Sequence, residues 1–193
     1  MDKTIRILGI AGSLRQGSYN RGTLRASAEL VPEGATIEIF ELEGIPGFNQ
    51  DDERNPPARV AEFKRKIREA DAILFVTPEY NYSIPGVLKN AIDWASRPYG
   101  ESAWNGKPAA IMGASIGSIA TARAQYHLRQ MMVFLNMFPV NQPEVMIGNA
   151  GEKFDSEGNL TDEATREFIR QLLQNLVDWT FRIREPEASE HAQ

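Results

Sequence analysis

Two short apolar segments constrain the fold of this chain more than any other feature. Residues 5–10 read Ile-Arg-Ile-Leu-Gly-Ile, and residues 72–77 read Ala-Ile-Leu-Phe-Val-Thr. Each has the length of one strand, and each is followed by a turn signal, at Gly12 and at Pro78. Runs of this kind are typical of strands buried on both faces, which occur in parallel sheets covered by helices. The chain is therefore predicted to be an α/β protein.

Further strands and helices alternate along the chain. Strands are predicted at residues 36–42, 109–114 and 145–147, and helices at residues 20–30, 60–70, 88–95, 120–137 and 161–183. This alternation predicts five parallel strands joined by right-handed crossovers. In such sheets ligands bind beyond the carboxyl ends of the strands, where the strand order reverses. The loops after the first, third and fourth strands are therefore the place to look for a site.

The 193 residues suit one domain, which is predicted at residues 1–184, with a frayed acidic tail at 185–193. The last helix is expected to begin with Thr161 as its N-cap. Its buried face is predicted to consist of Phe168, Ile169, Leu172, Leu173, Leu176 and Val177.

The helix at 120–137 is apolar nearly all round. One face is predicted to meet the sheet through Ala124, Leu128, Met131, Met132 and Leu135. The remaining apolar residues then point elsewhere: Tyr126, Val133, Phe134 and Met137. Such a helix is buried on both sides, which indicates a partner subunit. The alternative is that the loop at 97–108 covers it.

Composition excludes several classes of function. Cys is absent, so the chain has no disulfide, iron–sulfur cluster or thiolate nucleophile, and its two widely separated His residues argue against a metal site. A formal net charge of −5 provides no electrostatic footprint for nucleic acid. No apolar run approaches about 18 residues and no leader pattern precedes the first strand, so we expect a cytoplasmic protein without membrane insertion.

The loop after the first strand is predicted to bind a phosphate. A helix start offers free backbone N–H groups, and Ser13, Arg15, Ser18 and Asn20 add hydroxyl, guanidinium and amide donors. The loop is not a P-loop, because Ser18 stands where the required Lys would be, and the glycine spacing of a dinucleotide fingerprint is not met. A monophosphate such as that of FMN is the remaining candidate. The alternative is a glycine-rich turn without a ligand.

The loop after the third strand runs from Pro78 to Pro85 as Pro-Glu-Tyr-Asn-Tyr-Ser-Ile-Pro. Two prolines stiffen it, and its free N–H groups suit a flat heterocycle such as isoalloxazine. Singly, its residues have simpler interpretations: a surface Tyr, a salt-bridged Glu79, a turn at Asn81. After the fourth strand, Ser115 and Gly117 allow close approach to a planar ligand, although a plain strand-to-helix turn would look the same.

With these loops in view, the chain resembles the NADPH-dependent FMN reductase family, in particular its quinone and chromate reductase members. The most specific motifs are Gly12-Ser13-Leu14-Arg15 with Ser18 and Asn20, and the segment 78–86. The resemblance implies a flavodoxin-like, three-layer doubly wound fold with strand order 2-1-3-4-5. The implied FMN contacts are Ser13, Arg15, Ser18 and Asn20 for the phosphate, Pro78, Glu79, Tyr80, Asn81, Tyr82 and Ser83 along the ring, and Ser115 and Gly117 on its other side.

The resemblance also implies a homodimer or homotetramer. The chain departs from the family at one place, where Ala120-Thr121 replace a glycine pair that often precedes an Arg. The expected reaction is hydride transfer from NADPH or NADH through FMN to a small acceptor, with ping-pong kinetics and no side-chain acid or base. His127 is interpreted as a packed or interface residue. The competing hypotheses are a flavodoxin-like electron carrier and a flavin-free binding module.

Overall fold

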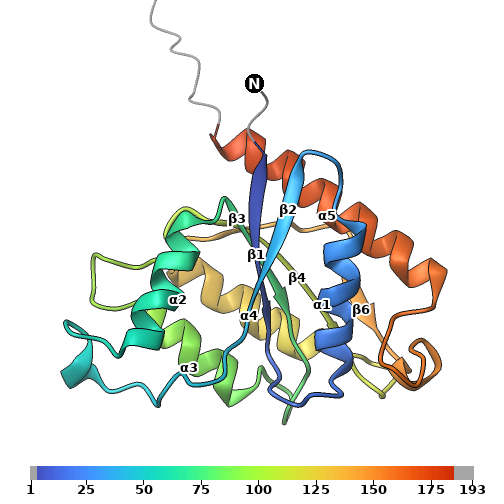
Figure 1. The fold of residues 1–193 in the computed structure, drawn as a ribbon, viewed down its shortest axis with the longest axis horizontal. Helices are drawn as coiled ribbons and strands as arrows, with labels where there is room; N and C mark the ends of the chain where they lie inside the picture. Colours follow the sequence, from blue (N-terminus) through green and yellow to red (C-terminus); the bar gives the residue numbers. More distant parts are fainter. Residues whose placement is uncertain (1–3, 185–193) are drawn as a thin grey trace, which may run out of the picture.

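The computed structural model describes residues 4–184. Its six strands form one parallel sheet in the order β2-β1-β3-β4-β5, and β6 pairs with β4 as well (Figure 1). The strands are β1 (Ile5–Ala11), β2 (Ala35–Phe40), β3 (Ala72–Val76), β4 (Pro108–Ala114), β5 (Phe138–Pro139) and β6 (Val145–Ile147). The helices are α1 (Tyr19–Leu30), α2 (Ala58–Glu69), α3 (Gly86–Ala95), α4 (Ala122–Phe134) and α5 (Glu163–Arg184), with 3-10 turns at Gln50–Asp52 and Ala150–Glu152.

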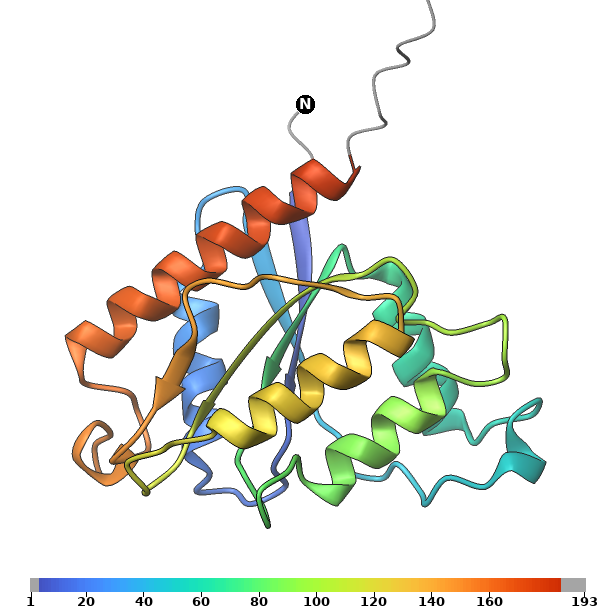
Figure 2. The same ribbon diagram turned by 180° about the vertical axis from the view of Figure 1, so that it is seen from behind.

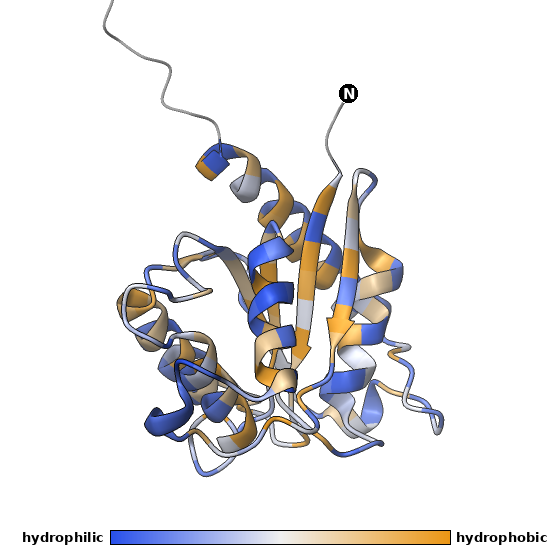
Figure 3. Ribbon diagram, turned by 60° about the vertical axis from the view of Figure 1, so that its left-hand side comes forward, coloured by the Kyte–Doolittle hydropathy of each residue, from blue (hydrophilic) through white to orange (hydrophobic). Residues whose placement is uncertain are grey.

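The molecule has three layers, as the flavodoxin-like assignment implies. One apolar core lies between the sheet and helices α1 and α5, and includes Leu24 and Leu172. A second core lies on the opposite face, against α2, α3 and α4, and includes Phe63 and Leu88. Figure 2, the view from behind, shows α4 lying obliquely across this face of the sheet. Figure 3 shows hydrophobic colours along most of the length of the strands. All five residues of β3 are buried, which accounts for its unbroken apolar sequence.

Two short strands pair with the outer edge of β4, and the sequence predicted one of them. The segment at Val145–Ile147 pairs with the carboxyl half of β4, whereas Phe138–Pro139 pairs with its first residues. The latter strand, β5, was not predicted, because two residues at the end of a helical pattern carry no strand periodicity. Within residues 4–184, no helix combines the length and apolarity needed to cross a bilayer.

Three detailed predictions about the helices were wrong. Asp162, not Thr161, caps α5, because its Oδ1 accepts the Thr165 N–H at 3.0 Å. Phe168 is exposed on α5 instead of buried. Met137 is buried, because the chain leaves α4 after Phe134 and turns back beneath the sheet edge. The tail predicted at 185–193 lies outside the described residues.

Candidate functional site

The three loops singled out from the sequence lie at one edge of the sheet, beyond the carboxyl ends of β1, β3 and β4 (Figure 1). The chain leaves β1 toward β2 on one side and later adds β3 on the other, so the strand order reverses between β1 and β3. This reversal is where ligands bind in open α/β sheets. The topology therefore brings the predicted residues to the expected place.

The loop between β1 and α1 contains several backbone N–H groups without an acceptor among the described residues. Ser18 caps α1, with its Oγ accepting the Asn20 N–H at 3.2 Å. Within residues 4–184, no protein group accepts a hydrogen bond from the N–H groups of Ser13, Leu14, Gln16 and Gly17. Backbone donors without partners beside a helix start are the usual means of holding a phosphate.

The cations near this loop differ in what they contact. Arg21 pairs with Glu41 at 2.8 Å, and Arg25 donates to the Gly158 carbonyl at 3.1 Å. The Arg15 side chain makes no hydrogen bond or ion pair with any described residue, and its guanidinium lies 5.9 Å from the centre of the Tyr19 ring. Arg15 is thus the guanidinium in this loop whose donors remain available to a ligand.

Asn20 has a different position from the other predicted phosphate residues. Its side chain is buried and pairs with the backbone of Ala114 in β4, donating to the carbonyl at 2.9 Å and accepting the N–H at 2.8 Å. The side-chain oxygen and one amide hydrogen are therefore used within the protein. Asn20 joins the start of α1 to the end of β4. It thus fixes the position of the loop between β1 and α1, the predicted phosphate loop.

The loop after β3 contains a tight two-residue turn. Tyr80 and Ser83 exchange two backbone hydrogen bonds, of 2.9 and 3.0 Å. Between them Asn81 and Tyr82 have φ values of 50° and 64°, a conformation that is rare for residues other than Gly. Each such residue costs about 1–3 kcal/mol and persists where surrounding structure enforces it, commonly at functional sites. Within residues 4–184 no protein group accepts the N–H of Asn81 or Tyr82.

Pro78 is buried at the start of this loop and Pro85 serves as the N-cap of α3, with φ of −60°. Pro85 therefore directly precedes the first residue of the helix, Gly86. Tyr80 and Tyr82 are exposed, and Ser83 is half-buried. The loop is held at both ends, as its two prolines predicted.

Glu79 points away from the turn and caps α4. Its side chain is buried, and Oε2 accepts the N–H groups of Arg123 and Ala124 at 3.0 and 3.2 Å. It also forms an ion pair with the Arg123 guanidinium. The salt-bridge interpretation of Glu79, left open by the sequence, is the one the structure shows.

Two residues of α4 contact the loop after β3 (residues 78–85, called the ring loop below). Neither was predicted as a site residue. The Arg123 guanidinium lies 3.7 Å from the centre of the Tyr82 ring, and His127 Nδ1 lies 3.0 Å from Ser83 Oγ. Each is 41 or 44 positions from its partner, so no local pattern could reveal these contacts. His127 is exposed, so the described chain does not pack it in the core, and its alternative interpretation as an interface residue stays a prediction.

The third loop, after β4, closes the site. A cleft of about 470 Å³ separates it from the ring loop, which is a size ordinary for small-molecule sites. The cleft is lined by Glu79, Asn81, Tyr82, Ser115, Gly117, Ser118, Ile119, Ala120 and Arg123. Ser115 Oγ accepts the Gly117 N–H at 3.2 Å, which shapes the turn. Besides Glu79, four of the predicted ring contacts thus lie around one cavity, namely Asn81, Tyr82, Ser115 and Gly117.

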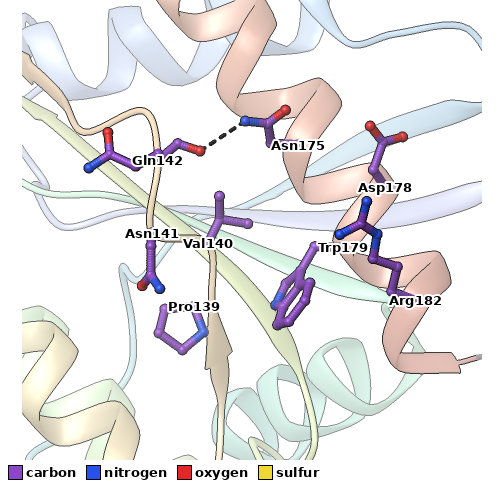
Figure 4. A pocket seen from close by; sticks show the side chains of 8 residues that line it. All are labelled: Pro139, Val140, Asn141, Gln142, Asn175, Asp178, Trp179 and Arg182. Atoms are coloured by element: carbon purple, nitrogen blue, oxygen red, sulfur yellow. Dashed lines mark hydrogen bonds between the residues drawn. The ribbon is translucent and has the colours of Figure 1, made fainter.

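Two other cavities contain none of the predicted residues. One, of about 320 Å³, lies between α5 and the segment that follows β5; Figure 4 shows its lining, with Asn175 of the helix donating to the Gln142 carbonyl. The other, of about 490 Å³, lies between α2 and the loop at 97–101. Neither adjoins the carboxyl ends of β1 and β3.

Comparison with known proteins decides what kind of site this is. The model of the NADPH-dependent FMN reductase family matches residues 5–152, which is most of the chain. The chain belongs to this family. Available N–H donors beside a helix start suit the FMN phosphate, and the cleft between two loops suits its flat ring, so the residues present fit the cofactor that the family name implies.

Relatives in the FMN reductase family cover almost the whole chain. An NAD(P)H-dependent FMN reductase of Pseudomonas aeruginosa is 56% identical over 186 residues, covering 95% of this chain and 100% of that protein. A 2-hydroxy-1,4-benzoquinone reductase of a Burkholderia species is 42% identical over 175 residues, covering 91% and 96%. A solved flavoenzyme, NAD(P)H:(acceptor) oxidoreductase of Paracoccus denitrificans, has a TM-score of 0.85 at 35% identity, covering 92% and 98%.

These comparisons confirm the resemblance found in the sequence, the flavodoxin-like fold, and the prediction of a flavin-dependent enzyme that uses FMN and NAD(P)H. The structure also explains the departure at Ala120-Thr121. Ala120 has φ of 56°, the left-handed conformation that a glycine adopts without penalty. The alanine at this position therefore carries a conformational cost of about 1–2 kcal/mol.

Proposed function

We propose that this protein catalyses hydride transfer from NAD(P)H to a small electron acceptor by way of bound FMN, with a quinone as the favoured acceptor class. Family membership supports the oxidoreduction. The observation that carries the proposal is the group of N–H donors at residues 13, 14, 16 and 17, which have no acceptor among the described residues and lie where the strand order reverses. Relatives named as quinone reductases support the acceptor class. FMN, when bound, supplies the hydride chemistry.

The chain's own residues bind and orient. We assign the phosphate to the N–H groups of residues 13, 14, 16 and 17, to the hydroxyls of Ser13 and Ser18, and to the Arg15 guanidinium. Charge-assisted hydrogen bonds of this kind are worth about 1.5–3 kcal/mol each. Asn20 contributes by position, because its side chain is already paired with Ala114.

The ring is assigned to the cleft between the second and third loops. The N–H groups of Asn81 and Tyr82 have no partner among the described residues and provide donors for the polar edge of the ring. Asn81 and Tyr82 line one side of the cleft, whereas Pro78, Tyr80 and Ser83 belong to the same loop without lining it. Ser115 and Gly117 frame the other, and the small residue at 117 leaves room for a planar ligand.

Several finer features belong to this proposal. We infer ping-pong kinetics, in which NAD(P)H and the acceptor occupy the same cleft in turn, a cytoplasmic location, and a homodimer or homotetramer. The alternative acceptors are free flavins, azo and nitro compounds, and chromate. The runner-up function is a flavodoxin-like electron carrier, which would hold FMN without oxidising NADPH.

One preparation separates these possibilities. The purified protein is examined for a bound-flavin absorption spectrum and is then mixed anaerobically with NADPH. Rapid bleaching followed by recovery of colour on addition of 1,4-benzoquinone is the expected result. Colour without bleaching identifies a carrier, and failure to bind added FMN rejects the assignment of the site. Parallel lines in double-reciprocal plots against NADPH and quinone would support the ping-pong order.

A further inference from the structure

Arg123 connects three parts of the candidate site that are distant in sequence. It follows the third loop as the second residue of α4, pairs with the buried carboxylate of Glu79, and stacks on Tyr82 in the tight turn. The two loops on either side of the cleft are therefore joined through one side chain. Its own exposure is intermediate, at 38%.

Backbone hydrogen bonds between Tyr80 and Ser83 close the base of the turn that Arg123 contacts, and its tip at Asn81 and Tyr82 is exposed. Tyr82 is 66% exposed, so its side chain is not held in a core. Its φ of 64° is an unfavourable backbone conformation for a residue other than Gly. The guanidinium lies 3.7 Å from the centre of its ring. Because the Glu79 carboxylate fixes the guanidinium from the other side, the stack has a rigid base.

We propose that Arg123 is a positioning residue of the flavin site, acting through Tyr82. By holding the Tyr82 ring, the guanidinium keeps the Asn81–Tyr82 turn in the conformation that points its N–H donors at the ligand. This inference rests on the proposed function, and it adds a role for a residue that the sequence motifs do not include. Glu79 supports the same arrangement by fixing the start of α4 and the guanidinium together.

The chain offers a matched control for the stack. Arg97 lies over the ring of Tyr99 with a separation of 3.8 Å, and Tyr99 is 68% exposed. The two stacks are thus alike in geometry and exposure, but the Arg97 stack lies in the loop between α3 and β4, away from the cleft. Loss of either stack removes a similar local interaction, and only one of them contacts the proposed site.

The experiment compares wild type, Arg123→Met, Arg123→Lys, Tyr82→Leu, the double variant Arg123→Met/Tyr82→Leu, and Arg97→Met. For each apoprotein the Kd for FMN is measured by quenching of flavin fluorescence. Visible circular dichroism of the bound flavin, kcat and KM for NADPH, and Tm are recorded alongside. We expect Arg123→Met to weaken FMN binding by about 3- to 30-fold and to change the visible dichroism, which reports ring orientation.

Arg97→Met should leave the FMN Kd within about twofold of wild type, since an exposed stack contributes locally. Arg123→Lys should keep the Tm, because the charge beside Glu79 is retained, and restore only part of the affinity. Tyr82→Leu should reproduce the loss seen in Arg123→Met. The double variant should lose no more than either single one, because both act through the same contact.

The inference is overturned if Arg123→Met binds FMN as wild type does, if Lys restores affinity completely, or if the losses in the double variant add. A loss of equal size in Arg97→Met would also overturn it. If Arg123→Met fails to fold, Tyr82→Leu alone decides, since an exposed ring is not needed for the core. Wild type that binds no FMN refutes the proposed function, and this inference with it.

Discussion

Arg15 is the residue on which the phosphate assignment can be tested most directly. Its guanidinium has no partner among the described residues, so its removal costs the fold little. We predict that Arg15→Ala weakens FMN binding by roughly 10- to 150-fold, the equivalent of one charge-assisted hydrogen bond, and leaves Tm unchanged. The measurement is a fluorescence titration of the apoprotein. Arg25→Ala is the matched control, since the Arg25 guanidinium donates to the Gly158 carbonyl, and an unchanged Kd in Arg15→Ala would contradict the assignment.

At this scale the sequence indicated the donors better than the contacts between them. Ser13, Arg15 and Ser18 were recognisable because donor residues gather at a strand-to-helix junction. Arg123 was not, because its partners Glu79 and Tyr82 lie on another loop and meet it only after the sheet has formed. A side chain that works by holding another loop leaves no periodic or local signal.

The Asn20 side chain hydrogen-bonds helix α1 to β4. Asn20→Ala would leave the buried N–H and C=O of Ala114 without partners, which costs about 1–3 kcal/mol. We predict a loss of that size in the free energy of unfolding, measured by urea denaturation, together with weaker FMN binding because the phosphate loop loses its anchor.

Asn90 provides the control for this effect. Its side chain also forms a two-way bridge, accepting the Phe48 N–H at 2.7 Å and donating to the Pro46 carbonyl at 2.9 Å. Asn90→Ala should therefore reduce stability and leave the FMN Kd unchanged. Loss of flavin affinity in both variants would show that Asn20 has no particular connection with the phosphate loop.

Helix α4 presents an apolar outer side that the rest of the described chain leaves uncovered. Val133 is 83% and Phe134 is 74% exposed, so the loop at 97–108 does not cover them, contrary to the alternative considered from the sequence. The predicted oligomer would bury this side. We predict that Val133→Glu/Phe134→Glu converts the protein to a monomer in sedimentation equilibrium. Phe168→Glu, on the exposed side of α5, should leave the mass unchanged, and an unaltered mass in the double variant would reject this interface.

Across the whole molecule, Asp71 joins the end of α5 to the amino-terminal edge of the sheet. Burial opposes its charge, but the hydrogen bond from the Arg6 N–H at 2.7 Å and the ion pair with Arg184 hold the pKa of Asp71 below its ordinary value. A depressed pKa in the folded state means that the carboxylate stabilises the fold above its unfolded pKa of about 3.9, and that this contribution is lost as pH falls through the folded value.

Asp71→Asn should accordingly lower the free energy of unfolding by about 1–3 kcal/mol at pH 7. The difference from wild type should shrink as the pH falls below about 4. Urea denaturation across pH 3 to 7 measures both effects. Asp51→Asn, an exposed carboxylate in the loop before α2, is the control, and a difference that stays constant with pH would contradict the role given to Asp71.

The overall architecture could be predicted because its strongest determinants are local. The apolar sequences of β1 and β3 and the stripes of the helices specify strands, helices and layers in order. What could not be predicted was the divided strand position beside β4, since Phe138–Pro139 is too short to show a period. The capping of α5 by Asp162 instead of Thr161 was a choice between adjacent cap-forming residues.

That divided position has a consequence for how the protein behaves at high concentration. An unpaired sheet edge invites strands from other molecules, and a stable pairing usually spans about five or six residues. On this flank an incoming strand would meet two residues, a break, and then three. Growth of the sheet from molecule to molecule is therefore discouraged on this flank. The opposite edge strand, β2, is longer, and the exposed charge of Glu38 is what opposes fibril formation there.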